Sequence, residues 1–250
     1  MEPVLSVRGL CKTFHREGKP DLLAVKNVSF DLLPREILGI VGESGSGKST
    51  LAKCVTRLHD ISAGTVTLMG RDIGHAGAAE MREAYRAMQM IFQSPMSSFN
   101  PRRTLGWSVG ECLRGLTAGQ RHDRVASLLA ECGLDAEIAR RYPHEVSGGQ
   151  CQRAAIARAL AADPKVLICD EATSALDVTV QKQIIELLGR LRHEKGLSLL
   201  FICHNLALVQ QFCDRVLVMR EGCVVEEGRP DDVIASPRHE YTQKLIDSVL

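Results

Sequence analysis

The sequence predicts an α/β protein with a buried, mixed or parallel sheet, an antiparallel β-subdomain and an inserted α-helical subdomain. Three runs are apolar throughout, which indicates strands buried on both faces. Three other segments, bounded by turn-forming residues, predict the antiparallel sheet. Between residues 78 and 162, longer helical patterns broken by glycine and proline predict the insertion. The apolar runs are residues 37–41, 166–169 and 199–203, and the antiparallel segments are residues 4–8, 23–32 and 65–69.

We expect one domain that spans residues 1–250. Approximately residues 1–90 and 160–250 are expected to form the core with its β-subdomain, and approximately residues 91–159 the helical subdomain. Helices are predicted over residues 124–132, 150–161 and 237–250, and a last hairpin over residues 216–219 and 224–226.

Composition and charge limit the classes of function. Lys and Arg total 31 against 30 Asp and Glu, so no overall positive field indicates nucleic-acid binding. The nine cysteines contain no Cys-x-x-Cys pair, which fits neither a disulfide framework nor a zinc site and favours a reducing cytoplasm. No stretch approaches the ~20 apolar residues of a membrane span, and residues 1–10 lack a leader pattern. Any membrane role is therefore expected at the surface.

A phosphate-binding motif of the form Gly-x-x-x-x-Gly-Lys-Ser follows the apolar run of residues 37–41 and leads into a predicted helix. Backbone N–H groups of such a loop surround a phosphate, and the helix N-terminus adds positive potential. Lys48 is expected to reach the β- and γ-phosphate oxygens, and Ser49 to bind Mg²⁺. The motif predicts a P-loop NTPase without choosing among kinases, GTPases, motors and transporter ATPases. The candidate nucleotide-binding residues are Gly42, Glu43, Ser44, Gly45, Ser46, Gly47, Lys48, Ser49 and Thr50.

Polar residues with catalytic potential end two of the apolar runs. Asp170 is expected to hold the Mg²⁺ shell, and Glu171 to polarise the attacking water. His204 follows the other run, where an imidazole could hydrogen-bond the γ-phosphate and hold Glu171 in place. Together with Lys48 these residues form a candidate hydrolytic site.

A second glycine-rich segment, Ser147-Gly148-Gly149-Gln150, precedes another predicted helix and offers a second phosphate site. A helix cap alone explains Ser147 but not the Gly-Gly-Gln that follows. Because each ATP has one γ-phosphate, we expect this segment to bind ATP held by a partner domain. The prediction is a head-to-tail dimer with two shared sites.

These motifs, in this order, resemble the ABC transporter ATPase family across nearly the whole chain, as do Gln93 after Ile91-Phe92 and the CDEATSALD segment at residues 169–177. The resemblance implies that Phe14 stacks on adenine, and that Gln93 contacts Mg²⁺ or the attacking water and senses a membrane partner. It also implies that residues 174–177 communicate across the dimer, with Asp177 among the nucleotide-contacting residues.

The sequence departs from the family pattern at two positions. Val146 stands where leucine is commoner, and Asn205 stands where an aspartate usually follows the histidine. Neither change removes a candidate catalytic group, so we still expect ATP hydrolysis.

Three segments resemble one branch, the peptide/nickel importer ATPases of bacteria: residues 92–102, 142–145 and 239–245. The resemblance implies a peripheral subunit at the cytoplasmic face of the cell membrane, energising uptake of peptides, nickel or a metal–metallophore complex. The implied partners are a second ATPase subunit, two permease subunits and, indirectly, an extracytoplasmic substrate-binding protein. A hetero-pair is favoured, and a homodimer stays open.

Two other functions stay open. One is a soluble ABC ATPase associated with a metabolic complex such as carbon–phosphorus lyase, and the other is an ATP-binding regulator that does not hydrolyse. Residues 94–102 look like a permease-facing surface and favour the importer. The intact Lys48, Glu171 and His204 favour hydrolysis.

Overall fold

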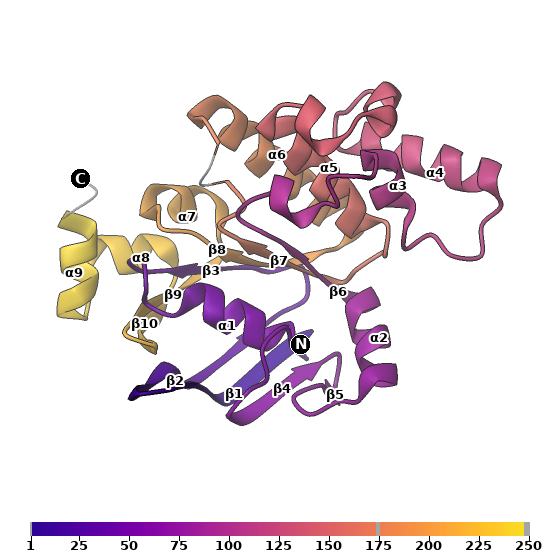
Figure 1. Cartoon of the computed structure of the whole chain (residues 1–250). Helices are drawn as coiled ribbons and strands as arrows, with labels where there is room; N and C mark the ends of the chain where they lie inside the picture. Colours follow the sequence, from indigo (N-terminus) through magenta and orange to yellow (C-terminus); the bar gives the residue numbers. More distant parts are fainter. Residues whose placement is uncertain (1, 174–175, 248–250) are drawn as a thin grey trace.

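The computed structural model describes residues 2–173 and 176–247, and it contains two sheets with helices around them (Figure 1). The strands are β1 (Leu5–Arg16), β2 (Lys19–Leu32), β3 (Ile37–Val41), β4 (Ala63–Leu68), β5 (Arg71–Asp72), β6 (Met88–Ile91), β7 (Val166–Asp170), β8 (Ser198–Ile202), β9 (Arg215–Arg220) and β10 (Cys223–Gly228). The α-helices are α1 (Lys48–Val55), α2 (Ala78–Ala87), α3 (Leu105–Gly110), α4 (Ala118–Glu131), α5 (Gly148–Leu160), α6 (Val178–Lys195), α7 (Leu206–Phe212), α8 (Pro230–Ala235) and α9 (Glu240–Asp247). Short 3-10 helices are η1 (Met96–Ser98), η2 (Ala136–Arg140) and η3 (Pro143–Glu145).

The six-stranded sheet, in the order β10-β9-β3-β8-β7-β6, forms the core and is covered on both faces. Its neighbours pair in parallel except for β9 and β10, which form an antiparallel hairpin. Along β3, Leu38 and Ile40 belong to one buried apolar cluster, and Ile37 and Val41 belong to the other. Successive side chains of a strand point to opposite faces, so this alternation confirms that the apolar runs are buried on both sides.

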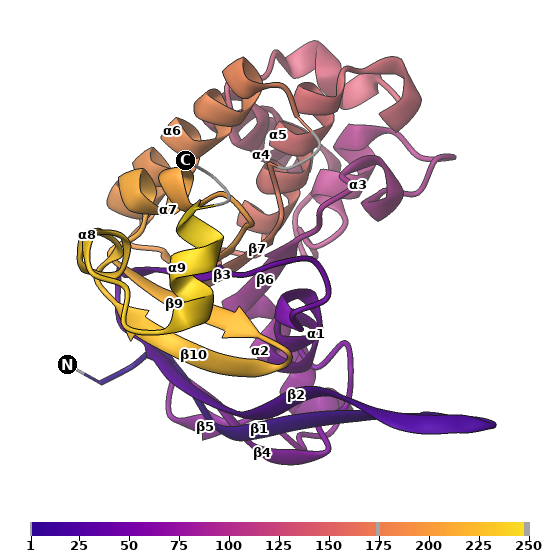
Figure 2. The same cartoon turned by 90° about the vertical axis from the view of Figure 1, so that its left-hand side faces the viewer.

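The four-stranded sheet, in the order β2-β1-β4-β5, is antiparallel, as the sequence predicts. Helix α1 lies between this sheet and the core sheet and contacts β1, β2 and β7 (Figure 1). β1 and β2 extend beyond the predicted 4–8 and 23–32, and Figure 2 shows their hairpin projecting from the body of the protein. Two sheets sharing one apolar cluster therefore enclose the helix that follows the phosphate-binding motif.

Helices α5, α6 and α7 cover the opposite face of the core sheet (Figure 1). Helices α3 and α4 pack against α5 and against each other to one side of the sheet. The predicted helix over residues 124–132 matches the end of α4 to within one residue, and that over residues 150–161 matches α5 apart from its first turn. Both helices begin with a capping box, which satisfies backbone donors of the first turn.

One local prediction is wrong, and one is confirmed with a later start. Met88–Ile91, within the stretch expected to be helical, forms the edge strand β6, because its backbone pairs in register with β7. The helix predicted over residues 237–250 is confirmed as α9, which begins only at Glu240. The backbone N–H groups of Arg238 and His239 donate instead to the Glu226 carboxylate, at 2.9 and 3.1 Å, which holds the chain in a turn before α9.

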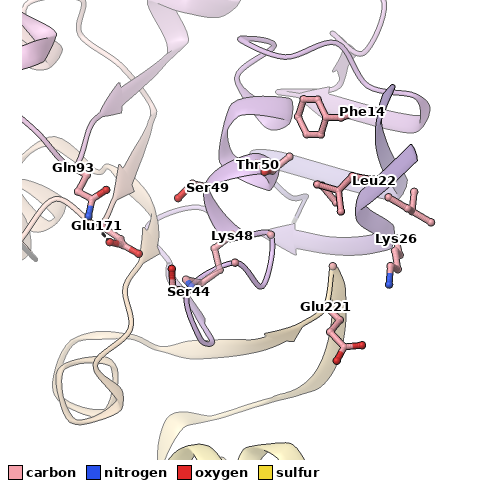
Figure 3. A pocket seen from close by; sticks show the side chains of 15 residues that line it. Phe14, Leu22, Lys26, Ser44, Lys48, Ser49, Thr50, Gln93, Glu171 and Glu221 are labelled. Atoms are coloured by element: carbon pink, nitrogen blue, oxygen red, sulfur yellow. Dashed lines mark hydrogen bonds between the residues drawn. The ribbon is translucent and has the colours of Figure 1, made fainter. Parts of the chain in front are cut away.

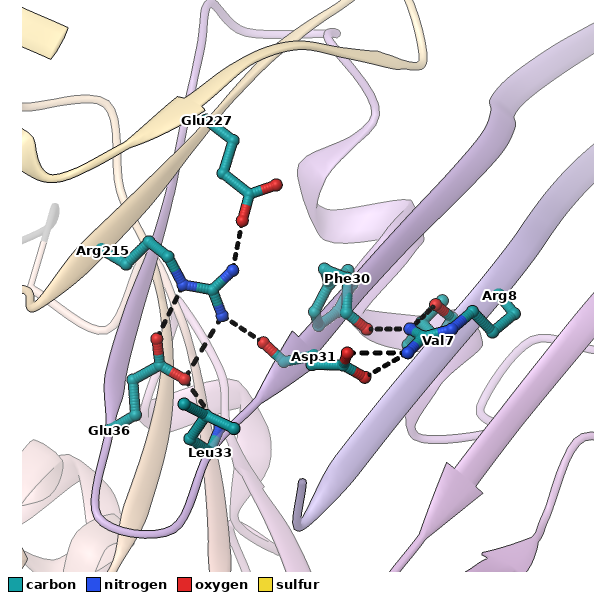
Figure 4. Close-up of polar contacts among 8 residues, drawn as sticks. All are labelled: Val7, Arg8, Phe30, Asp31, Leu33, Glu36, Arg215 and Glu227. Atoms are coloured by element: carbon teal, nitrogen blue, oxygen red, sulfur yellow. Dashed lines mark hydrogen bonds and ion pairs between the residues drawn. The ribbon is translucent and has the colours of Figure 1, made fainter. Parts of the chain in front are cut away.

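A polar junction ties the two sheets together near the end of β2 (Figure 4). The Arg215 guanidinium on β9 donates to Glu36 Oε1 at 2.8 Å, to the Asp31 backbone oxygen and to Glu227. The Asp31 carboxylate accepts two hydrogen bonds of 2.7 Å from Arg8 on β1. Because Glu36 is only 8% exposed, this arginine compensates a buried charge where the sheets meet.

Candidate nucleotide site

The phosphate-binding motif lies between the end of β3 and the start of α1. Gly42, Gly45 and Gly47 adopt positive φ angles of 151°, 82° and 102°. At Gly47 a Cβ would lie 2.5 Å from the Ala24 backbone oxygen, so only glycine fits. Gly47 also occupies the N-cap of α1, where no side chain among the described residues caps the helix. The first N–H groups of α1 are therefore left for a ligand, as an anion site requires.

Lys48 is buried beneath this loop, with 3% of its surface exposed. Its Nζ donates to the backbone oxygens of Gly42 and Glu43 at 2.7 and 2.8 Å. Burial lowers the pKa of the ammonium, and the nearby charge of Glu171 is the largest of the effects that oppose the shift. The ammonium also donates to the Ser46 hydroxyl at 3.4 Å. A partly desolvated ammonium held by neutral oxygens is well suited to exchange one of them for a phosphate oxygen.

Ser49 and Asp170 meet although they are far apart in the sequence. The Ser49 hydroxyl, on α1, donates to Asp170 Oδ1 at the end of β7 over 2.8 Å. Asp170 is 5% exposed; its burial raises the pKa of the carboxyl, while the hydrogen bond from Ser49 opposes that shift. A hydroxyl and a carboxylate that converge in this way are the oxygen ligands that Mg²⁺ prefers.

Glu171 lies directly after β7 in a left-handed backbone conformation, with φ of 49°. Its N–H donates to the Ile202 backbone oxygen at 3.0 Å, which fixes the turn against the end of β8. Gln93 Nε2 donates to Glu171 Oε2 at 2.8 Å, so the two candidate catalytic side chains are brought together. A non-glycine residue held at positive φ beside a candidate site is strained, and the hydrogen bond to β8 supports it there.

One cavity of about 610 Å³ is lined by Lys48, Ser49, Gln93 and Glu171, whereas Asp170 lies behind Ser49 and outside the lining (Figure 3). Its walls come from the phosphate-binding loop, from β1 and β2, from the β9–β10 turn, and from Gln93 and Glu171 on the opposite side. Sequence reasoning missed six of the lining residues, which no motif marks and which only the folding of β2 and β9–β10 against the loop brings near. They are Leu22, Leu23, Ala24, Lys26, Glu221 and Gly222.

Phe14, the predicted adenine-stacking residue, lines the same cavity on the side away from Glu171 (Figure 3). The ammonium of Lys12 lies 4.9 Å from the centroid of its ring, and the His59 ring meets it edge-on at 5.4 Å. The ring is half-buried, so one part remains open to the cavity. An aromatic face in this position can stack on a nucleobase.

The Ser147-Gly148-Gly149-Gln150 segment is not among the described residues that line the cavity. Ser147 Oγ accepts the Gln150 N–H at 3.2 Å, and Gln150 Oε1 accepts the Ser147 N–H at 3.0 Å. A Cβ on Gly149 would lie 2.6 Å from Val180 Cγ1. From the sequence, a helix cap is expected to explain Ser147 but not Gly148, Gly149 and Gln150. The structure shows that the cap also uses Gln150, and that close packing against α6 requires glycine at position 149.

The remaining predicted residues lie outside the cavity among the described part of the chain. His204 is exposed after β8, and Asn205 caps α7 by accepting the Leu208 N–H at 3.1 Å. Asp177 caps α6 by accepting the Val180 N–H at 3.0 Å. Ser174 and Ala175, predicted to communicate across a dimer, lie outside the described residues.

This fold and this cavity define a P-loop nucleotide-binding protein with an attached antiparallel sheet. The chain belongs to the ABC transporter family, whose model matches residues 25–174. The family resemblance and the predicted fold class are both confirmed.

Named relatives and solved structures extend this similarity. The glutathione import ATP-binding protein GsiA of Salmonella paratyphi A is 48% identical over 257 residues, covering 99% of this chain and 41% of that protein. The oligopeptide transport ATP-binding protein OppF of Salmonella typhimurium is 47% identical over 232 residues, covering 91% of this chain and 70% of that protein. The chain thus spans well under half of the GsiA protein it matches.

A solved structure of a dimeric, post-hydrolysis state of the ATP-binding cassette MJ0796, bound to ADP and Pi, aligns with a TM-score of 0.83 and 29% identity. The alignment covers 90% of this chain and 98% of that one. Within residues 2–173 and 176–247, no helix is long and apolar enough to cross a membrane.

Proposed function

We propose that this chain binds ATP with Mg²⁺ and hydrolyses it as the energising subunit of a bacterial ABC importer. The observation that carries the proposal is one cavity with the uncapped N-terminus of α1 and Lys48 on one side and Glu171 with Gln93 on the other. Phosphate-binding groups and a carboxylate able to orient water thus face the same space.

Each predicted residue has a role in this proposal. The N–H groups of the loop from Gly42 to Thr50 and the ammonium of Lys48 hold the phosphates. Phe14 stacks on adenine, Glu171 holds the attacking water and accepts its proton, and Gln93 orients Glu171. His204 approaches the γ-phosphate only once the site is complete.

The residues present fit Mg²⁺. Ser49 Oγ and Asp170 Oδ1 already converge at 2.8 Å, and Gln93, across the cavity from Ser49, could add an amide oxygen. Bound there, Mg²⁺ would neutralise charge that develops on the phosphate oxygens. Asp170 and Ser49 would hold it from opposite elements, β7 and α1.

The second half of the proposed site comes from another ATPase subunit. Two observations support this second half. Ser147 to Gln150 and Asp177 do not line the cavity of their own chain. Ser147 and Gly148 are exposed on the surface of the protein. We propose a head-to-tail pair, preferably with a different ATPase subunit, in which this segment meets the partner's nucleotide. The ADP-bound MJ0796 cassette is described as dimeric, which supports the pairing of two such domains.

The proposed setting is the cytoplasmic face of the membrane, with two permease subunits and, indirectly, an extracytoplasmic binding protein. The helical part at approximately residues 91–159 would be the subdomain that meets the permeases. The names of GsiA and OppF support a peptide-like cargo. Nickel and metal–metallophore complexes are the other cargoes of the predicted class. Neither of the two names points to carbon–phosphorus lyase.

Glu171→Gln in the assembled transporter tests the proposal. The variant keeps the size of the side chain and its contact with Gln93, so ATP binding is expected to be intact. Turnover is expected to fall by at least about 100-fold, because the group that accepts the water proton is lost. With the isolated ATPase subunits, an ATP-dependent dimer should accumulate on size-exclusion chromatography. Hydrolysis at the wild-type rate in this variant would contradict the proposal.

A further inference from the structure

Helix α9 contacts the phosphate-binding loop at Glu43. Tyr241, in the first turn of α9, is 4% exposed, and its hydroxyl accepts the backbone N–H of Glu43 at 2.9 Å. This contact joins residues 198 positions apart in the chain. It also occupies the N–H of Glu43, so that this member of the predicted phosphate-binding set is directed away from the phosphates.

The peptide groups on both sides of Glu43 are held. Its N–H donates to Tyr241, and its carbonyl oxygen accepts Lys48 Nζ at 2.8 Å and the Ser46 N–H at 3.2 Å. The next residues, Ser44 and Gly45, line the nucleotide cavity. The hydrogen bond from Glu43 to Tyr241 therefore sets the direction in which the loop enters the cavity.

Tyr241 is itself firmly placed. The Glu226 carboxylate on β10 accepts the N–H groups of Arg238 and His239, and His239 Nδ1 accepts the N–H of Tyr241 at 3.0 Å. The Arg220 guanidinium lies 5.1 Å from the centroid of the tyrosine ring. Figure 2 shows α9 standing beside β9 and β10, which carry these anchoring residues. The hydroxyl is thus presented to the loop by a rigid support.

A second cavity of about 250 Å³ lies between α9 and the loop, and Glu43 and Tyr241 line it. Ser44 and Gly45 line both this cavity and the nucleotide cavity. Tyr241 itself lines only the second cavity, so it reaches the nucleotide site through the loop and not by direct contact.

We propose that Tyr241 is a positioning residue for the ATP site, and that α9 holds the phosphate-binding loop in its binding-competent form. This inference rests on the proposed function, because it concerns the affinity for ATP. Without the hydroxyl, the loop populates the competent form only part of the time, and the apparent affinity falls by that fraction. Loss of one such hydrogen bond corresponds to a weakening of about three- to ten-fold.

Tyr241→Phe in the full chain removes the hydroxyl and keeps the ring. The matched control is Tyr85→Phe, the same change on α2, whose side chain lies outside both cavities. ATP affinity is measured by isothermal titration calorimetry. In this method a misfolded fraction lowers the apparent number of binding sites per chain and leaves the dissociation constant unaffected. Hydrogen exchange of the peptide that covers residues 38–47 is followed by mass spectrometry in the absence of nucleotide.

The expected result is a dissociation constant about three- to ten-fold higher for Tyr241→Phe, with faster exchange of the loop peptide, and wild-type values for Tyr85→Phe. In the assembled transporter, the KM for ATP should rise while kcat stays near its original value, a split that general loss of folded protein would not produce. An unchanged dissociation constant in Tyr241→Phe overturns the inference. Failure of the wild-type chain to bind ATP overturns the proposed function instead, and unchanged exchange in the loop would still overturn the positioning role.

Discussion

Two glycine-rich segments precede helices in this molecule, and they are built in opposite ways. Before α1, Gly47 stands at the N-cap, no described side chain caps the helix, and the loop encloses the buried Lys48. Before α5, Ser147 and Gln150 exchange hydrogen bonds in a capping box on an exposed surface. The first segment leaves its backbone donors to a ligand, whereas the second satisfies its own first turn.

The second segment is therefore stable without a ligand, yet it keeps one hydrogen-bond donor for a partner. A serine hydroxyl has two acceptor positions and one O–H donor, and capping uses only an acceptor position. Ser147 can therefore cap α5 and donate to a phosphate at the same time. Capping of α5 and contact with a phosphate are therefore compatible roles for Ser147, and experiments must distinguish between them.

The largest expected effect is that of Ser147→Asp in the assembled transporter. Aspartate caps a helix as well as serine does, so the thermal stability of the chain should stay close to that of wild type. Aspartate lacks the hydroxyl donor and places a negative charge where the partner's γ-phosphate is proposed to lie. Steady-state ATP turnover is therefore expected to fall by at least about 100-fold.

Ser147→Ala is the complement, because it removes the cap and the donor together. It should lower stability by about 1 kcal/mol in addition to lowering turnover. If Ser147→Asp hydrolyses ATP as fast as wild type, the segment is only a helix cap, and the shared site must be abandoned.

A smaller effect, on stability, distinguishes the glycines of the two segments. Gly47→Ala places a Cβ 2.5 Å from the Ala24 oxygen at a φ of 102°, so unfolding free energy should fall by about 2–4 kcal/mol. In Gly148→Ala the new Cβ would meet Leu176 Cδ2 at 3.6 Å, an ordinary van der Waals contact. That variant should change stability by less than about 0.5 kcal/mol. Urea denaturation measures both, and equal losses would show that the two segments are under similar local constraint.

The smallest effect concerns the support that α9 gives to the first segment. Burial acts to raise the pKa of Glu226, but the hydrogen bonds it accepts, including those from the N–H groups of Arg238 and His239, bring it below its ordinary 4.5. A carboxyl with a lowered folded-state pKa stabilises the fold above its unfolded value, and the contribution is lost as pH falls through the folded-state value. Glu226→Gln should thus be less stable than wild type by about 1 kcal/mol near pH 7.

The same comparison at lower pH supplies the control. The difference in urea midpoint between Glu226→Gln and wild type should shrink as the pH is lowered below about 4.5. A difference that is independent of pH would mean that the charge of Glu226 contributes nothing to anchoring α9.

Much of the site could be predicted because its chemistry is local in sequence. The loop from Gly42 to Ser49 and the pair Asp170 and Glu171 each follow an apolar run, and parallel strands bring their carboxyl ends to one edge of the sheet. The hydrogen bond between Ser49 and Asp170 realises that expectation. In contrast, β6 could not be predicted from Met88–Ile91, because its pairing with β7 decides its conformation.

Sequence motifs alone were thus enough to predict the family, the buried core strands, and the groups available for phosphate and water at their ends. Short motifs achieve this because hydrogen bonding and backbone geometry within a few residues depend little on the rest of the chain. The packing of distant segments was needed to bring Lys26 and Gly222 into the wall of the cavity and to join Tyr241 to the phosphate-binding loop. Those contacts join segments far apart in the chain, and their geometry follows from how two sheets and a terminal helix pack, which no local pattern records.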